Sequence, residues 1–319
     1  MRTLYFLWIF LLNNIFAYES KDNLKIFWWN LGQNKHSEKS RDHKFSTVLE
    51  ENIYHFNWDS YDVIVFGEYH HKFFREFAFA KIKKEFKYNI TIRYNTEEHY
   101  FKKFRIFSKH KFTYTIDELD WVHPLWSDTQ KERYQRKAFK SFGPTNTFKR
   151  AFVLLNFTIN KNNFYLIPYH FNNPWNGISK QFGRYSKKYG KFVAAMSLIF
   201  GKRNPLYNQL ESMHYMLYKH LGSNYDRRLL AMIGDSNCPH LLRGWAPDCY
   251  KKLERVLSII DPGENKYTYP GYNLKKKEVD DKLRIDHTSA SSSFITSWSE
   301  VLQIEGSDHN PISLDLVLP

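Results

Sequence analysis

Short runs of apolar, β-branched and aromatic residues alternate along the chain with longer amphipathic stretches, and this alternation predicts an α/β domain. The predicted strands are Leu24–Leu31, Asp62–Gly67, Arg105–Phe107, Ala151–Ile159, Phe164–Tyr169, Leu229–Gly234, Leu283–His287 and Ile312–Val317. The predicted helices are Lys44–Phe56, Phe73–Phe86, Lys191–Phe200 and Leu206–Leu221. The segment Asp117–Pro144 shows little periodicity, so we expect it to be irregular.

One turn indicates the type of sheet. The strands Ala151–Ile159 and Phe164–Tyr169 are separated by the turn-forming sequence Asn-Lys-Asn-Asn, which should fold them into an antiparallel hairpin. The sheet is therefore expected to be mixed, unlike the parallel sheet of a dinucleotide-binding domain. A chain of 319 residues is long enough for one large domain with a well-buried core.

The N-terminus has the pattern of a secretory signal peptide. Arg2 precedes an apolar run from Leu4 to Leu12, and the small residue Ala17 stands at a plausible cleavage point. We therefore predict a signal peptide over residues 1–17 and a secreted or periplasmic protein. A permanent membrane anchor is the less favoured alternative, because the apolar run is shorter than the roughly 20 residues that a spanning helix needs.

The chain is strongly basic, with a formal net charge of +14, of which the predicted signal peptide contributes only Arg2. Such a protein is attracted to polyanions, either nucleic acid or an anionic membrane surface. A second interpretation is that lysine side chains solubilise a surface that is rich in aromatic residues. Composition alone does not separate the two.

Only two cysteines occur, Cys238 and Cys249. In an oxidising compartment a pair this close in sequence favours one disulfide, and two free buried thiols are the alternative. Neither their number nor their spacing indicates a zinc site.

Two predicted strands end in residues that suit a hard cation, and a third ends in an imidazole. The first strand reaches Asn30, the second is followed by Glu68, and amide and carboxylate oxygens are the ligands that Mg²⁺ and Ca²⁺ prefer. The strand Phe164–Tyr169 leads to His170, with Asn172 two positions later. Each residue taken singly also has an ordinary explanation: Asn30 as a turn residue, Glu68 as a solvated strand end and His170 as a structural histidine.

Two further segments carry groups for acid–base chemistry. Asp235 and Asn237 follow a buried strand and stand two positions apart, so that both can face one pocket. Asp308 and His309 directly precede the last strand. An adjacent carboxylate can orient an imidazole over a reacting water, which makes this the most specific motif in the chain.

In order along the chain, these segments resemble the endonuclease/exonuclease/phosphatase superfamily, which has the deoxyribonuclease I-like fold. The sequence Arg-Ile-Asp-His at 284–287 adds a further match, and the resemblance extends from Leu24 to Leu318. Two departures, Gly67 in place of the usual Gln and Ser236 in place of an aromatic or apolar residue, indicate a divergent member. The resemblance implies a four-layer α/β sandwich, with two mixed β-sheets packed face to face and helices outside, over a single catalytic domain at 18–319.

The resemblance also implies metal-dependent hydrolysis of phosphoric esters. Asn30 and Glu68 would hold Mg²⁺, with Ca²⁺ or Mn²⁺ as alternatives. His309, oriented by Asp308, would be the general base toward water, although Asp235 takes that role in some accounts of the superfamily.

The remaining candidate residues receive supporting roles by the same resemblance. Asp235 and Asn237 would position the nucleophile and the phosphate, and His170 would assist the phosphate or the leaving oxygen. Arg150 and Asn172 would face the substrate phosphate, although Arg150 is equally well explained as a solvated charge at a strand end. Asp286 would support a histidine from behind the site.

The substrate class stays open between two alternatives. The net charge and the basic block Gly177–Arg203 favour a nuclease. A phospholipid phosphodiesterase or phosphoinositide phosphatase that acts on an anionic lipid head group is the alternative, and Phe294, Ile295 and Trp298 are candidates for a membrane-inserting hairpin or, more simply, a core strand. A non-catalytic binding module would lack a metal or base residue, and none is missing. We expect a monomer without a stable transmembrane anchor.

Overall fold

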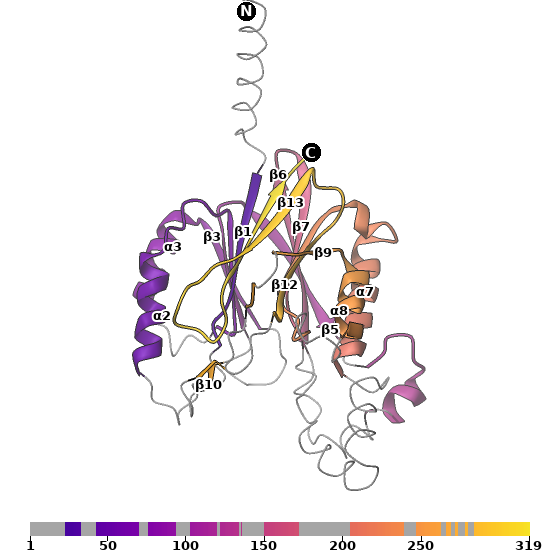
Figure 1. Ribbon diagram of the computed structural model, residues 1–319. Helices are drawn as coiled ribbons and strands as arrows, with labels where there is room; N and C mark the ends of the chain where they lie inside the picture. The colour runs from indigo at the N-terminus through magenta and orange to yellow at the C-terminus, as the bar shows by residue number, and fades with distance from the viewer. Residues whose placement is uncertain are drawn as a thin grey trace, which may run out of the picture.

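The computed structural model describes residues 23–32, 43–69, 76–93, 103–119, 122–133, 135, 150–171, 205–238, 247–262, 266–268, 272–273, 278–279 and 284–319. These residues form two six-stranded mixed sheets and a small two-stranded sheet, with helices on the outside (Figure 1). No described helix is long and apolar enough to cross a membrane.

The first sheet has the strand order β13-β14-β1-β2-β4-β3. Its strands are β1 (Asn23–Asn30), β2 (Val63–Gly67), β3 (Tyr88–Arg93), β4 (Lys103–Ser108), β13 (Thr296–Val301) and β14 (Ile312–Val317). β1 pairs with β2 in parallel and with β14 antiparallel. The carboxyl ends of β1 and β2 therefore lie at the same edge of the sheet as the residues just before β14.

The second sheet has the strand order β5-β6-β7-β8-β12-β9. Its strands are β5 (Phe112–Leu119), β6 (Arg150–Ile159), β7 (Asn162–His170), β8 (Leu229–Asp235), β9 (Ile259–Ile260) and β12 (Asp286–Ala290), while β10 (Tyr272–Asn273) and β11 (Glu278–Val279) pair separately. The predicted hairpin between β6 and β7 is present. Its two linking residues, Asn160 and Lys161, have φ values of 50° and 70°, as a type I′ turn requires.

Three apolar clusters hold the layers together. A central cluster lies between the two sheets and includes Trp28 from β1 and Leu155 from β6. A second cluster buries the outer face of the first sheet under α2 (His43–His55), η1 (Glu76–Phe79) and α3 (Ala80–Glu85). A third buries the outer face of the second sheet under α7 (Pro205–Leu221), η3 (Tyr225–Arg227) and α8 (Pro247–Val256). The predicted four-layer α/β sandwich is confirmed.

Several elements were absent from the sequence prediction. Strands β3, β5 and β13 lie at sheet edges, where exposed side chains weaken the apolar signal, and β5 runs through the first part of the segment that was expected to be irregular. Helix α8 was also missed. The strand predicted at Leu283–His287 is instead β12, a few residues later. The predicted helix Lys191–Phe200 and the basic block Gly177–Arg203 lie outside the described residues.

Candidate functional site

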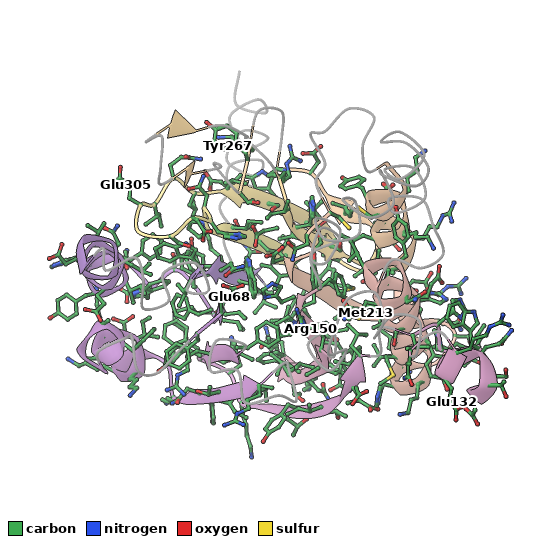
Figure 2. All side chains as sticks on the ribbon, turned by 90° about the horizontal axis from the view of Figure 1, so that it is seen from below. Glu68, Glu132, Arg150, Met213, Tyr267 and Glu305 are labelled. Carbon is green, nitrogen blue, oxygen red and sulfur yellow. The ribbon has the colours of Figure 1, made fainter. Side chains whose placement is uncertain are left out.

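The candidate site lies where the ends of central strands from both sheets meet. β7 and β8 run in parallel so that His170 stands beside Asp235, and β12 runs antiparallel to β8 so that Asp286 stands on the other side of Asp235. In the first sheet Asn30 lies opposite Gly67, directly before Glu68. Viewed along the strands, Glu68 and Arg150 both lie toward the middle of the molecule (Figure 2).

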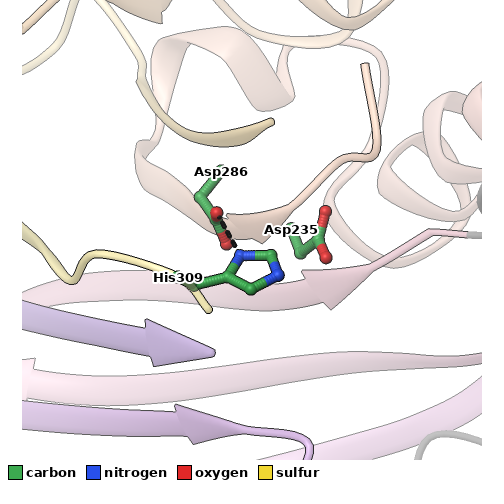
Figure 3. Close-up of side chains that lie close together, drawn as sticks. All are labelled: Asp235, Asp286 and His309. Carbon is green, nitrogen blue, oxygen red and sulfur yellow. Dashed lines mark hydrogen bonds and ion pairs between the residues drawn. The ribbon is translucent and has the colours of Figure 1, made fainter. Parts of the chain in front are cut away.

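The core of the site is a buried carboxylate–imidazole pair. Asp286 Oδ2 lies 2.7 Å from His309 Nδ1, and both side chains are buried (Figure 3). Burial alone would lower the pKa of His309, but the negative charge and the hydrogen bond of Asp286 outweigh it and raise that pKa to about 10. The imidazole is therefore oriented at Nδ1, which leaves Nε2 facing the rest of the site.

The hydrogen-bond partner of His309 Nδ1 is Asp286, and not Asp308, which the sequence analysis expected to orient this imidazole. Asp308 Oδ1 points toward Gly32, so closely that a Cβ built on Gly32 would lie 1.7 Å from it. Neighbouring residues of a loop direct their side chains differently, and the partner of His309 comes instead from a strand of the other sheet. Asp286, which was expected to support a histidine, thus makes its contact with His309.

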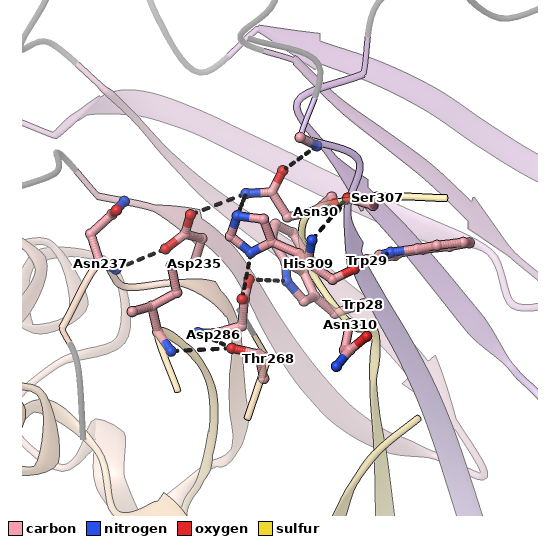
Figure 4. A network of polar contacts seen from close by, with 12 residues as sticks. Trp28, Trp29, Asn30, Asp235, Asn237, Thr268, Asp286, Ser307, His309 and Asn310 are labelled. Atoms are coloured by element: carbon pink, nitrogen blue, oxygen red, sulfur yellow. Dashed lines mark hydrogen bonds and ion pairs between the residues drawn. The ribbon is translucent and has the colours of Figure 1, made fainter. Parts of the chain in front are cut away.

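Asn30, Asp235 and Asn237 form a chain of hydrogen bonds beside this pair (Figure 4). Asn30 donates from Nδ2 to Asp235 Oδ2 at 3.0 Å, and the same nitrogen lies 3.5 Å from His309 Nε2. The backbone N–H of Asn237 donates to Asp235 Oδ1 at 2.8 Å, and Asn237 Nδ2 donates to the carbonyl of Phe171. Asp235 is thereby held at both oxygens.

Glu68 and His170 also lie close to Asp235. His170 Nε2 is 3.6 Å from Glu68 Oε1 and 3.5 Å from Asp235 Oδ2. Glu68 adopts a φ of 52°, an uncommon conformation for a residue with a side chain, of the kind that is concentrated at functional sites. The structure therefore places both predicted catalytic histidines around one carboxylate.

Arg150 is a buried residue at the start of β6 and not the solvated strand-end charge of the alternative interpretation. Only 5% of its surface is exposed, and its Nε donates to the carbonyl of His170 at 3.1 Å. Asn172, the second residue predicted to face phosphate, lies outside the described residues.

Sequence reasoning missed the residues that hold the pair in place. Trp29 Nε1 donates to the carbonyl of His309, and Trp28 Nε1 donates to Asp286 Oδ1. Thr268 Oγ1 accepts from the backbone N–H of Asp286, and its carbonyl accepts from that of Asn310. The only available signal was the Trp-Trp pair directly before Asn30, which is indistinguishable from core packing in the sequence.

The structure does not show the predicted disulfide: Cys238 and Cys249 are both buried as thiols, in contact with each other. They pack in the outer cluster under α8. Burial, followed by contact with Cys249, raises the pKa of the Cys238 thiol well above its ordinary value. The segment after Asp235 is held by hydrogen bonds instead, since Ser236 Oγ donates to the carbonyl of Ile285 and accepts from the backbone N–H of Cys238.

The charge balance of the site suits a divalent cation. Burial, then the charge of Asp286, and further the charge of Glu68 raise the pKa of Asp235 well above its ordinary value, although His309 acts in the opposite direction. Asp235, Asp286 and His309 each offer a ligand atom, and these atoms lie within 4.8 Å of one another. Buried carboxylates in excess of cationic groups are the donor set that hard divalent cations occupy.

Comparison with known proteins shows similarity in structure. No protein-family model matches the sequence, and no curated protein matches it significantly. SmcL superposes with a TM-score of 0.57 at 12% identity, over 92% of this chain and 99% of that one. An endonuclease/exonuclease/phosphatase from Bacteroides vulgatus gives 0.55 at 14% identity, over 94% and 100% of the two chains. Beta toxin 275-280 from Staphylococcus aureus gives 0.51 at 12% identity, over 91% and 99%.

These similarities extend over nearly the whole of each chain and define the fold. It is the fold of the endonuclease/exonuclease/phosphatase proteins, as the order of the sequence motifs predicted.

Proposed function

We propose that this protein is a secreted, divalent-metal-dependent phosphodiesterase whose preferred substrate is nucleic acid, with residues 18–319 as its catalytic domain. The observation that carries the proposal is the buried Asp286–His309 pair, with the carboxylates of Asp235 and Glu68 close by where the two sheets meet. An oriented imidazole next to a cation site is the arrangement that metal-assisted attack of water on a phosphoric ester requires.

Glu68 and Asn30 would hold the cation, with Asp235 close by. Asn30 Oδ1 accepts a hydrogen bond from the backbone N–H of Gly32, which fixes the amide while leaving its oxygen a second lone pair. When bound, Mg²⁺, or Ca²⁺ or Mn²⁺ in its place, offsets the carboxylate charge and stabilises the negative charge that develops on phosphate oxygens.

His309 would accept the proton of the attacking water at Nε2. Asp286 holds the opposite nitrogen and stabilises the imidazolium that forms. In the metal-free protein a pKa of about 10 keeps His309 protonated at neutral pH, so His309 would act as a base only where the positive charge of the bound cation lowers that pKa. Asp235 would position this water, because its two oxygens are fixed by Asn30 and Asn237.

The other side of the phosphate would face His170. This imidazole lies near both Glu68 and Asp235, so it can carry a proton and donate a hydrogen bond to a phosphate or leaving-group oxygen. Arg150 supports it from behind, since it bonds the backbone of His170, and Asn237 and Asn172 complete the predicted contacts to phosphate.

We favour nucleic acid over a lipid as the substrate because of the net charge of the chain and because of where its exposed apolar residues lie. The net charge of +14 favours a phosphate backbone. The membrane alternative relied on Phe294, Ile295 and Trp298, but Phe294 is buried. Ile295 and Trp298 are exposed, yet they lie at the end of the sheet where β1 begins, away from Asn30 at its other end. They are not placed to bring a bilayer to the site.

A substrate panel tests the proposal. Protein recovered from expression of the full chain would be incubated with supercoiled plasmid, single-stranded RNA, sphingomyelin vesicles and a phosphoinositide, each with Mg²⁺ and with chelator. We expect cleavage of nucleic acid that needs Mg²⁺ and is lost in His309→Ala. Hydrolysis of a lipid head group alone would refute the substrate class while supporting the reaction class. No hydrolysis of any substrate would refute both.

A further inference from the structure

Trp28 makes a direct polar contact with the buried Asp286–His309 pair. Its indole is completely buried in the central cluster between the sheets, and its Nε1 donates to Asp286 Oδ1 at 2.9 Å (Figure 4). The other oxygen of Asp286 accepts from His309 Nδ1 at 2.7 Å. The carboxylate that orients the imidazole is therefore itself held at its second oxygen.

The hydrogen bond from Trp28 limits the rotation of the Asp286 carboxylate. A carboxylate with one hydrogen bond can still rotate about its Cβ–Cγ bond, and the imidazole plane would follow that rotation. Trp28 lies on β1 and Asp286 on β12, in different sheets, so the bond between them also ties the two halves of the sandwich at the site. Since Asp286 is fully buried, loss of this donor could not be replaced by solvent.

Gly67 explains how an indole fits at this position. A Cβ built on Gly67 would lie 2.5 Å from Cη2 and 2.9 Å from Cζ2 of Trp28, which is closer than real carbon contacts allow. Gly67 and Trp28 therefore belong together, because the absence of a side chain at position 67 leaves the space that the indole ring occupies.

We propose that Trp28 is a positioning residue for the Asp286–His309 pair, and that Gly67 is required to admit its ring. This inference rests on the proposed function for its effect on rate, but the geometry that it describes can be measured without any substrate.

The first test is Trp28→Phe, which keeps an aromatic ring and removes the N–H. We expect kcat to fall about tenfold to a hundredfold, the scale for losing one hydrogen bond to a charged group, with KM nearly unchanged. Trp58→Phe is the matched control, because Trp58 is also fully buried and its Nε1 also donates to an acceptor, the carbonyl of Ile53, far from the site. It should lose comparable stability and keep its kcat.

Gly67→Ala supplies an independent variant that keeps the indole but displaces it. It should lower kcat in the wild-type background and have less effect in the Trp28→Phe background, since coupled residues are not additive. This variant also carries the test if Trp28→Phe does not fold. Equal effects of Gly67→Ala in both backgrounds would contradict the pairing of the two residues.

A measurement on the metal-free protein separates this inference from the proposed function. The proton shared between His309 Nδ1 and Asp286 should give a far-downfield NMR resonance, assigned by its loss in His309→Ala. We expect the resonance to shift or broaden in Trp28→Phe and to stay in place in Trp58→Phe. If wild type hydrolyses nothing but the resonance moves, the proposed function fails and the positioning role stands. An unmoved resonance overturns the inference, as does a kcat that Trp28→Phe leaves unchanged in an active protein.

Discussion

Asp286 and His309 are hydrogen-bonded at 2.7 Å although they come from different halves of the sandwich. Asp286 is the first residue of β12 in the second sheet, and His309 lies in the loop that leads into β14 of the first sheet. The contact exists only when the two sheets pack face to face with their strand ends in line. Folding of the whole sandwich therefore assembles this pair, and changes that shift one sheet against the other should affect the proposed reaction before they unfold the protein.

Asp286→Asn should lower kcat by on the order of 10²–10⁴, because the neutral amide neither stabilises the imidazolium nor reliably selects the correct tautomer of His309. Asp308→Asn is the informative comparison, since Asp308 is adjacent in sequence but directed toward Gly32. We expect a clearly smaller loss of kcat for this variant. Steady-state rates of the two variants, each checked for normal thermal unfolding, would decide the matter, and an equal or larger loss in Asp308→Asn would restore Asp308 as the partner.

His170 and His309 should act as one unit around a single phosphate. Each alanine variant is expected to lose on the order of 10²–10⁴ in rate, the usual scale for general acid–base catalysis. The double variant should lose much less than the product of the two single losses, because residues that act in one catalytic unit are strongly non-additive. Multiplicative losses in the double variant would show that the two imidazoles act independently.

Glu68→Gln should reduce activity mainly by weakening cation binding, so raising the Mg²⁺ concentration should restore part of the rate. Glutamine retains the size of the side chain at a position where φ is 52°, so structural damage should be small. The measurement is the rate as a function of Mg²⁺ concentration in wild type and variant. A loss of rate that Mg²⁺ does not alter at any concentration would argue against a role of Glu68 in holding the cation.

The stability of the metal-free protein should depend on pH through His309. Its pKa is raised from 6.5 to about 10, so its contribution is complete below pH 6.5 and is lost as the pH rises toward 10. Between these limits the free energy of unfolding, relative to that of His309→Gln, should fall by at most about 1.4 kcal/mol per pH unit. Denaturant unfolding of both proteins in chelator would measure this difference. Parallel pH profiles would contradict the strong Asp286–His309 interaction.

The sequence predicted the fold and most strand ends because both follow from local patterns. The buried strands β1, β2, β7 and β8 are continuous apolar runs, and each ends in or just before a polar residue that the structure brings to the site. The edge strand β5 was missed because Tyr114 and Ile116 are about half exposed and their neighbours are polar, so no buried face marks the strand.

The contacts between side chains could not be predicted because they depend on how the sheets face each other. Asp308 is next to His309 in the sequence and was the natural choice as its partner, but a loop does not fix the directions of adjacent side chains. The tryptophan at position 28 had the pattern of a core residue, which it is, and its bond to Asp286 becomes visible only when β1 packs against β12. The spacing of the two cysteines predicted that they lie together, and the structure brings both thiols into contact, but it does not show the disulfide itself.

The most direct test of the central claim is the hydrolysis of a small chromogenic phosphodiester, which needs no recognition of nucleic acid or lipid. Wild type, Asp286→Asn and His309→Ala would be compared in Mg²⁺ and in excess chelator. The structure predicts turnover by wild type in Mg²⁺, a large loss of turnover in both variants, and none in chelator. Full activity of wild type in chelator, or wild-type turnover by His309→Ala, would contradict it.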